Sequence, residues 1–471
     1  MLLAAAEARI VFHRTVPSDL SSDAVLITYS RFRVEPVHHR QLVLCAAENL
    51  WNHYGKEPSL PPSPLARVPL ASLGARPSAR LQDPLILPYA SASVPAAVEI
   101  RRDTAPGAAA SIVSGADLVA SAFFWISRYE ESLIAERDEF GRVPQDRLCA
   151  VQEEITDRPL VDEYAELLLA WLEMLDVRIR SRRSPFRALL SHDVDSGIGV
   201  NGFRENAANG LRTFYREAVR GRRPWTAVVG LGHWTLRALG LRDEASVFRD
   251  IGRLDAEFGF PSFFFLMANG THPEDAPYDI LSEASLKVIE AIREGGGGIG
   301  LHVGLNAHRT FDQFRSEWER LRKAAPDALP VSRSHFLTFL TPATWRQLVE
   351  LGIRIDSTLG FSHDAGFRSG TCHGFRPFDV AAREVLPIWE LPMILMDVNL
   401  FYRPEAVAGI RRVRDLVGRV RAHGGCFVVN WHNVSYVGRF RSTYRSILGD
   451  LRDAQPVRLD QLPAEDGSLV W

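Results

Sequence analysis

Two acidic residues end an apolar stretch near the middle of the chain, and they are the first candidates for chemistry. The stretch reads LLSHDVD from Leu189, which places Asp193 and Asp195 two positions apart. Side chains alternate along a strand, so acids at this spacing point to the same side. Two like charges that close need a cation or a raised pKa to coexist. The pair predicts a metal ligand beside a general base, or else two acids on a solvated turn.

Further along the chain, other expected strands also end in a histidine or an acid. A single histidine of this kind is more often structural than catalytic. Parallel strands, however, deliver their carboxyl ends to one rim, so several polar ends in succession favour a shared site. The residues concerned are His302, Arg333, His335, Asp397 and His432.

The second half of the chain alternates short apolar strands with helical patterns, which indicates parallel strand-helix-strand units. The expected strands are 188–191, 262–267, 298–303, 331–336, 353–356, 391–396 and 426–431. The expected helices are 245–258, 285–293, 310–324, 342–351 and 404–422. This alternation predicts an α/β fold, either a barrel or a doubly wound sheet.

The first half predicts a smaller α+β unit. We expect a strand over 23–29 and helices over 116–129 and 164–175. Residues 56–87 are rich in Pro, Ala and Arg, which suits a loop or extended segment better than a packed element. The stretch 180–185 ends in a proline that opposes a helix, so it predicts a hinge. The expected domains are therefore 1–185 and 186–471.

Length and composition bound the remaining possibilities. A chain of 471 residues predicts two or three domains, and 46% hydrophobic with 24% charged residues excludes disordered and fibrous proteins. The net charge of −2 gives no reason to expect nucleic acid as a partner. Four widely spaced cysteines predict free thiols. Without a membrane-length apolar run or a secretory signal, we expect a cytoplasmic protein.

Over about residues 186–440, the motifs and their order resemble the polysaccharide deacetylases of carbohydrate esterase family 4. The resemblance implies an irregular (β/α)7 barrel. It implies that Asp193 is the catalytic base, that Arg333 pairs with this base, and that His432 is the general acid, oriented by Asp397. The segments that carry it are Asp193 to Asp195, Phe263 to Leu266, Ile299 to His302, Arg333, Asp397 and Trp431 to His432.

The expected metal site departs from the usual pattern of that family. The resemblance makes Asp195 and His302 ligands, but Asn306 stands where the family has its second histidine. His335 shares a strand face with Arg333, so we predict it as the third ligand, with His308 as the substitute. Two histidines and a carboxylate with an open position suit Zn²⁺, with Fe, Co or Ni as alternatives.

A second resemblance is to the accessory domain that precedes the barrel in a bacterial deacetylase-like subfamily. It rests on residues 123–131 and 138–142 of the first half and on 356–360 and 366–372 of the second. No distinct chemistry accompanies this domain. We interpret the charges around Arg128, Glu130 and Glu131 as a domain interface.

Together these patterns predict a metal-dependent hydrolase that removes an N-acetyl or other N-acyl group from an amino sugar in a polysaccharide, oligosaccharide or carrier-linked glycan. One alternative is hydrolysis of a non-sugar C–N bond on the same barrel. Another is a carbohydrate-binding protein that has lost full metal coordination. Clustered arginine and tryptophan in 201–242 suit a membrane surface or an anionic carrier, although a solvated face is the plainer interpretation.

Overall fold

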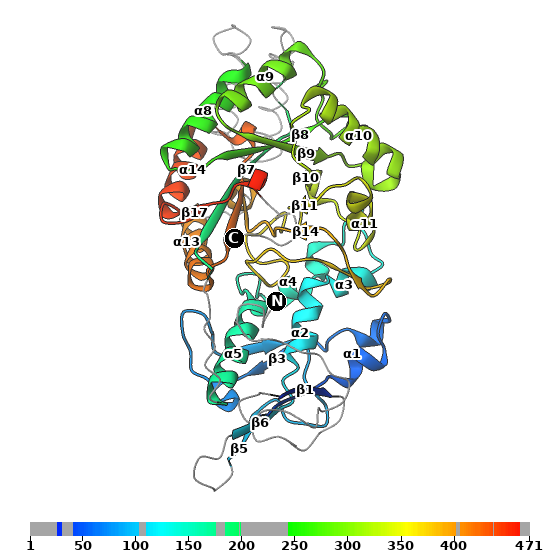
Figure 1. Ribbon diagram of the computed structural model, residues 1–471, viewed down its shortest axis with the longest axis vertical. Coiled ribbons are helices and arrows are strands. Elements are labelled where there is room, and N and C mark those ends of the chain that lie inside the picture. Colours follow the sequence, from blue (N-terminus) through cyan, green and yellow to red (C-terminus); the bar gives the residue numbers. More distant parts are fainter. Residues whose placement is uncertain are drawn as a thin grey trace.

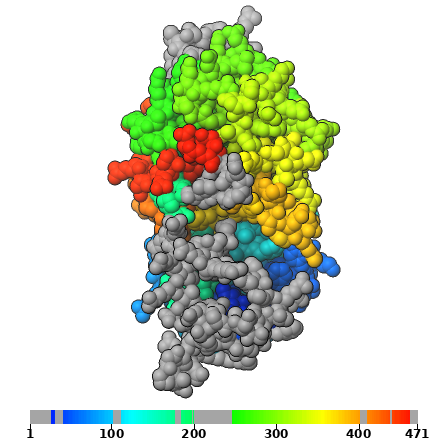
Figure 2. Space-filling view, viewed as in Figure 1, coloured from blue at the N-terminus to red at the C-terminus, as the bar shows by residue number. Residues whose placement is uncertain are grey.

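The computed structural model describes residues 26–30, 41–102, 110–175, 184–196, 198, 244–401, 406–436 and 438–461. These residues form two parts stacked along the long axis, with the part up to residue 175 at the bottom of Figure 1. Each part has its own main core. One core gathers buried side chains between Leu42 and Leu175 together with Phe361, and the other gathers side chains between Phe186 and Ala454. In Figure 2, orange segments of the larger part lie directly against cyan segments of the smaller part.

The larger part is built on a curled sheet of parallel strands in the order β14-β11-β10-β9-β8-β7-β16-β15, with β17 beside β7. This confirms the predicted α/β fold, and the curl is compatible with a barrel. The strands are β7 (Arg187–Val194), β8 (Ser262–Met267), β9 (Gly298–Val303), β10 (Val331–Ser334), β11 (Ile355–Asp356), β14 (Trp389–Glu390), β15 (Leu395–Met396), β16 (Cys426–Asn430) and β17 (Gln455–Pro456).

One chain segment supplies both ends of this sheet. β14 pairs with β11, and β15 pairs with β16, while only residues 391–394 separate β14 from β15. Within that interval Leu391 N donates to Asp356 O, and Ile394 N donates to Val428 O. The predicted strand 391–396 is therefore wrong in its extent. Only Leu395–Met396 forms a strand, because residues 391–394 cross from the β11 side of the sheet to the β16 side.

Helices follow the strands and cover the outside of the sheet (Figure 1). Their apolar faces are buried, as at Ile292 of α9 (Glu283–Glu294) and Leu321 of α10 (Phe311–Ala324). The five predicted helices of this half are confirmed to within two residues at each end. The helices are α8 (Glu244–Glu257), α9 (Glu283–Glu294), α10 (Phe311–Ala324), α11 (Ala343–Glu350), α12 (Asp397–Phe401), α13 (Ala406–His423) and α14 (Gly438–Asp450). A short antiparallel pair, β12 (Phe378–Asp379) and β13 (Glu384–Val385), lies off the main sheet.

The smaller part carries a four-stranded sheet in the order β1-β2-β6-β5, in which β5 is antiparallel to β6 and the other pairs are parallel. The predicted helix 116–129 is broken, because Arg128 adopts a left-handed φ of 54° between α2 and α3. The elements are β1 (Leu26–Ser30), β2 (Gln41–Cys45), β5 (Val98–Arg102), β6 (Ala110–Ser114), α1 (Glu48–Asn52), α2 (Leu118–Ile126), α3 (Tyr129–Leu133), α4 (Cys149–Gln152) and α5 (Leu160–Met174).

Residues 56–87 are packed into the smaller part, contrary to the expectation of a loop or extended segment outside the packed elements. They hold the antiparallel pair β3 (Ala66–Val68) and β4 (Leu85–Leu87), and the 3-10 turns η1 (Glu57–Ser59) and η2 (Leu70–Leu73). Leu70, Leu73 and Leu85 have no exposed surface. The prolines interrupt regular elements here, but the leucines between them still supply the core.

Two predictions fall on residues that are largely outside the described ranges, namely the hinge at 180–185 and the anionic-carrier or membrane contact through 201–242. Among the described residues, no helix is both long and apolar enough to cross a bilayer. All four cysteines are free thiols.

Candidate metal centre

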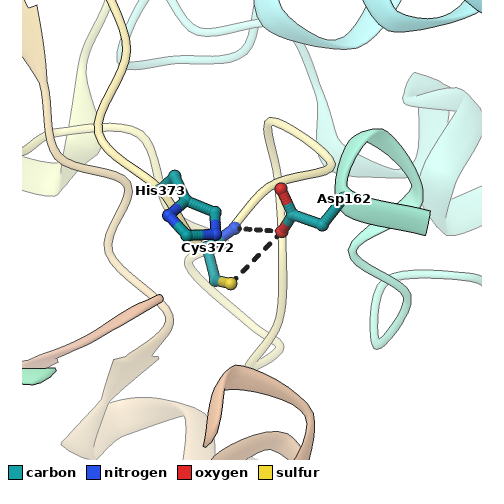
Figure 3. Close-up of side chains that lie close together, drawn as sticks. All are labelled: Asp162, Cys372 and His373. Carbon is teal, nitrogen blue, oxygen red and sulfur yellow. Dashed lines mark hydrogen bonds between the residues drawn. The ribbon is translucent and has the colours of Figure 1, made fainter. Parts of the chain in front are cut away.

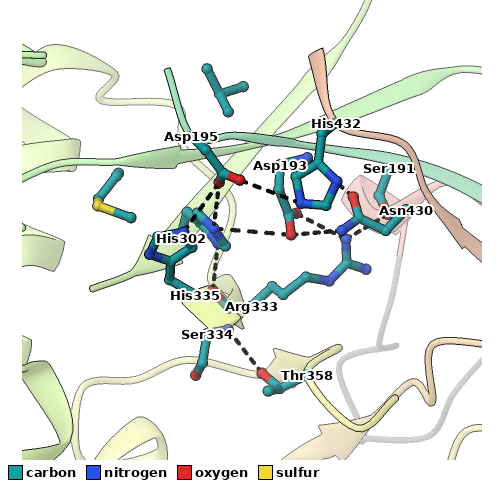
Figure 4. Close-up of polar contacts among 12 residues, drawn as sticks. Ser191, Asp193, Asp195, His302, Arg333, Ser334, His335, Thr358, Asn430 and His432 are labelled. Carbon is teal, nitrogen blue, oxygen red and sulfur yellow. Dashed lines mark hydrogen bonds and ion pairs between the residues drawn. The ribbon is translucent and has the colours of Figure 1, made fainter. Parts of the chain in front are cut away.

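All the residues predicted for the site except His308 lie at or near the carboxyl ends of the parallel strands, and Figure 4 shows Asp193, Asp195, His302, Arg333, His335 and His432 close together. Asp193 lies near the end of β7, and Asp195 follows that strand by one residue. His302 lies on β9 and Arg333 on β10, while His335 begins the 3-10 turn η6 (His335–Leu337) that follows β10. The remaining two are Asp397, the first residue of α12, and His432, two residues beyond β16.

Asp195, His302 and His335 bring one carboxylate and two imidazoles together. Asp195 Oδ1 lies 3.1 Å from His302 Nε2 and 3.7 Å from His335 Nε2. One potential ligand atom from each of the three residues lies within 4.8 Å of the other two. Both imidazoles are buried, but the Asp195 side chain is 27% exposed, so solvent reaches the group.

The far nitrogens of the two rings identify which atoms face Asp195. His302 Nδ1 lies 3.0 Å from the Arg333 carbonyl oxygen, and His335 Nδ1 lies 3.3 Å from Asp275 Oδ1. A ring nitrogen that faces such an acceptor carries the proton, so the other nitrogen of a neutral imidazole has a lone pair. Two such lone pairs then face a carboxylate, an arrangement that a divalent cation or extra protons must stabilise. The three side chains therefore fit a metal ion, with the outer hydrogen bonds that commonly orient histidine ligands.

Asp193 is held beside this group as a buried, ionised carboxylate. Its Oδ1 accepts a 3.0 Å hydrogen bond from Arg333 Nη1, and its Oδ2 accepts one of 2.7 Å from Asn430 Nδ2. Burial alone would raise the pKa of Asp193, but the surrounding positive charge, foremost that of Arg333, outweighs burial and lowers this pKa below its ordinary value. Asp193 is thus an anion at neutral pH.

His432 pairs with a buried acid on its far side and faces the metal group on the other. Its Nδ1 lies 2.6 Å from Asp397 Oδ1, and its Nε2 lies 3.4 Å from Asp195 Oδ2. Burial lowers the pKa of His432, but the carboxylates of Asp397 and Asp195 outweigh burial and raise it to about 10. The imidazole can therefore hold a proton at neutral pH and present it toward the space beside Asp195.

His308, the predicted substitute ligand, does not join the group. It lies on the 3-10 turn η5 (Ala307–Arg309), where its ring packs edge-on against Phe314 of α10. Its Nδ1 is 3.3 Å from Thr344 Oγ1, and burial lowers its pKa to about 4. Among the described residues, the group with Asp195 is completed by His335 instead.

Two residues of the site were missed by sequence reasoning. Asn430 donates to Asp193 and also accepts from the Asp193 backbone N–H at 3.2 Å. Its position at the end of β16, two residues before His432, was an available signal. Asp275 comes from the loop between β8 and α9 and is buried against His335. No strand or helix period marks that loop, so the sequence offered no sign of Asp275.

A second group of potential ligands joins the two parts of the molecule, and it is already satisfied without a metal (Figure 3). Asp162 of α5 accepts from Thr371 Oγ1 at 2.7 Å, from Cys372 N at 2.9 Å and from Cys372 Sγ at 3.2 Å. Burial and the charge of Asp162 raise the pKa of the Cys372 thiol well above its ordinary value. Because the Asp162 carboxylate already accepts three hydrogen bonds from the 371–373 loop, Asp162, Cys372 and His373 are interpreted as an anchor for that loop.

Comparisons with known proteins give one match to a family profile and several distant matches to solved structures. A profile described as "Family of unknown function (DUF7033)" matches residues 25–176, which include the smaller part. No curated protein matches. A "putative polysaccharide deacetylase from Mycobacterium smegmatis" matches with 16% identity and a TM-score of 0.37, covering 59% of this chain and 90% of its own.

Two other solved structures are similar over part of the chain. A "putative polysaccharide deacetylase involved in o-antigen biosynthesis" from Bordetella bronchiseptica has 18% identity and a TM-score of 0.25, covering 40% of this chain and 66% of its own. A 4-alpha-glucanotransferase from Thermococcus litoralis has 11% identity and a TM-score of 0.34, covering 59% and 40%. These likenesses are too distant to assign a function, which depends on the residues of the site.

Proposed function

We propose that this protein is a metal-dependent hydrolase that removes an N-acyl group, such as acetyl, from an amino sugar of a glycan. The observation that carries the proposal is the set of three neighbouring units at one rim. These units are the Asp195, His302 and His335 group, the Asp193 carboxylate with Arg333, and the His432 imidazole with Asp397. They correspond to a cation site, a general base and a general acid, the parts that amide hydrolysis requires.

Asp195, His302 and His335 would hold a divalent ion, and two nitrogens with one carboxylate suit Zn²⁺. Such an ion supplies a Lewis acid for the acyl carbonyl and makes a nearby water more acidic. Asp193 accepts the proton of the attacking water. Arg333 keeps this carboxylate ionised and fixed in direction, since its guanidinium also donates to Ser357 O at 2.9 Å.

His432 then delivers a proton to the departing amine. Asp397 Oδ1, at 2.6 Å from Nδ1, holds one proton on that far nitrogen, so the proton delivered is the second one, on Nε2, which faces the site. The base and the acid are thus two separate residues, one on β7 and the other two residues beyond β16. This separation lets one residue take a proton while the other gives one.

The test compares metal content and acetate release in the purified protein and two variants. The wild type is expected to bind about one zinc per chain and to release acetate from N-acetylated amino sugars or their oligomers. Asp193→Asn should keep the metal and lose about 10²- to 10⁴-fold in turnover. Asp195→Ala should lose both metal and turnover.

Asp453→Asn is a suitable control, because Asp453 pairs with Arg421 on the surface and its side chain is 55% exposed. It should match the wild type in both measurements. Full turnover by Asp193→Asn would contradict the proposal. A wild type that binds a glycan but no zinc after reconstitution would instead indicate a binding protein.

A further inference from the structure

Phe336 is an exposed aromatic residue held in a sparsely populated backbone conformation directly beside the metal group. The residue is 37% exposed, and it follows the proposed ligand His335. The centroids of these two rings are 4.5 Å apart. Both Phe336 (φ 52°) and Leu337 (φ 55°) are left-handed, a conformation that side chains with a Cβ seldom adopt. Such backbone strain persists only where the surroundings enforce it, and it concentrates at functional sites.

The surroundings that enforce it come from the other part of the molecule. Phe140 stacks on Phe336, with ring centroids 4.5 Å apart and planes inclined by 26°. Arg142 Nη1 donates a 2.6 Å hydrogen bond to the Phe336 carbonyl oxygen. The smaller part therefore braces the ring of Phe336 and fixes its backbone from a position 194 residues away in the chain.

The bracing segment is itself rigid. Asp138 Oδ1 accepts from the backbone N–H groups of Phe140 and Arg142, and Asp138 Oδ2 pairs with Arg142 Nε at 2.8 Å. Gly141 allows the tight turn with a φ of 79°. This turn is the 138–142 segment that the sequence singled out and that the proposed reaction does not use. Its conformation is set by its own hydrogen bonds, so the stacked rings are ordered before any ligand arrives.

We propose that Phe336, backed by Phe140 and fixed by Arg142, is a stacking platform for a pyranose ring of the substrate, one sugar unit away from the reacting amide. The inference rests on the proposed function, because that function places a glycan at this rim. An exposed aromatic face binds the apolar C–H face of a sugar, and a ring that is already immobile loses little conformational entropy on binding. The smaller part is then a component of the substrate site.

Binding of two sugar probes tests the platform. N-acetylglucosamine and its β-1,4-linked tetramer are titrated calorimetrically into the zinc-loaded full-length Asp193→Asn protein, in which slow turnover spares the probe. Adding Phe336→Ala should weaken tetramer binding about threefold to tenfold, the range of one aromatic contact. The loss should be smaller for the monosaccharide, which does not extend beyond the reacting unit. Phe336→Trp should restore tetramer binding.

Ile100→Ala is the matched control, because Ile100 of β5 is also an exposed apolar side chain, at 38%. It should leave both affinities unchanged. Phe140→Ala leaves the strained turn intact, so it decides the question if Phe336→Ala fails to fold, and it should weaken the tetramer preferentially too. Equal tetramer binding with and without the aromatic rings, equal losses for both probes, or no tetramer binding at all would overturn the platform.

Failure of the platform and failure of the hydrolase can be told apart. Acetate release by the wild type is measured separately from the titrations. If the protein releases acetate but binds the tetramer independently of Phe336, the proposed hydrolase activity stands and the proposed platform is wrong. If it binds the tetramer through Phe336 but releases no acetate, the platform stands and the hydrolase activity is wrong.

Discussion

Asp195 and Asp162 each lie within 4.8 Å of two other potential metal ligands, but their surroundings differ in kind. The partners of Asp195 are imidazole nitrogens, which can present lone pairs to a cation. Those of Asp162 are a hydroxyl, a backbone amide and a thiol, and all three donate hydrogen bonds to it. The Asp195 side chain is also partly open to solvent, whereas Asp162 is 6% exposed.

Potential ligand residues at short distance do not by themselves make a metal site. What decides is whether the carboxylate still needs a positive partner. Asp162 has its hydrogen bonds complete, so a cation would have to displace protons that are already well placed. Asp195 Oδ1 faces two nitrogens, those of His302 and His335, whose ring protons are directed elsewhere, so a cation completes the group on that side.

The largest expected difference is in metal content after alanine replacement. Asp195→Ala should reduce bound zinc from about one per chain to a trace and abolish activity, because it removes the negatively charged ligand. Asp162→Ala should retain the zinc of the folded protein. Elemental analysis of both purified variants measures the difference. If the Asp162→Ala protein is fully folded but binds no zinc, then Asp162 also contributes to metal binding.

Asp275 allows a finer test of the Asp195 group. Asp275→Asn removes the carboxylate that orients His335 while keeping the shape of the side chain, and it should weaken zinc binding about 10- to 100-fold. Competition with a coloured chelator measures the affinity. Asp279→Asn is the control, since Asp279 pairs with Arg320 at the surface. Identical affinities for the two variants would mean that Asp275 does not orient His335.

Substitutions in the Asp162 group should instead lower the stability of the folded protein. Asp162→Ala leaves buried donors of the 371–373 loop without an acceptor, which should lower the free energy of unfolding by about 1–3 kcal/mol or more. Urea unfolding of the zinc-free proteins measures this effect. Thr371→Val, which removes one of the donors, should cost less than Asp162→Ala. If Asp162→Ala unfolds at the same urea concentration as the wild type, Asp162 does not anchor the 371–373 loop.

A third set of buried acids gives a pH-dependent effect. Burial raises the pKa of Glu130 to about 7, and it outweighs the opposing charge of Arg128. The stability from this shift is present below the unfolded pKa near 4.5 and is lost as pH rises through 7. Glu130→Gln should remove that decline, of about 1–3 kcal/mol.

Urea unfolding of the wild type and Glu130→Gln at a series of pH values isolates this contribution. Exposed Glu136, which pairs with Arg147 at the surface, gives Glu136→Gln as the control. The control should follow the wild type at every pH. A parallel decline in the Glu130 variant would mean that another group titrates.

The site was more predictable from sequence than its supports. Asp193, His302 and His432 are polar residues at or just beyond the ends of apolar strands, and parallel topology alone brings such residues to one rim. His335 was inferred from a strand face, although it lies just beyond β10 and reaches Asp195 from a turn. Asp275 depends on a loop path that no periodic pattern encodes.

The fold was similarly readable where the period was strong. Helices such as α10 have a long amphipathic repeat, so their bounds were predicted closely. The two strands within 389–396 were not predicted, because the division depends on the first half pairing with β11 and the second half pairing with β16. The packing of 56–87 was missed because composition does not show where leucines between prolines point. The boundary at 185 stays a prediction.

Glu131 lies between two arginines from different parts of the chain. Its Oε1 accepts from Arg128 Nη2 at 2.6 Å and from Arg368 Nη2 at 2.8 Å, and all three side chains are buried. Neither part can therefore be exchanged for a counterpart from another protein unless the counterpart carries the complementary charge, because an unpaired buried guanidinium or carboxylate would remain. We therefore expect the two parts to be inherited as a pair in evolution, and they should be transferred as a pair in protein engineering.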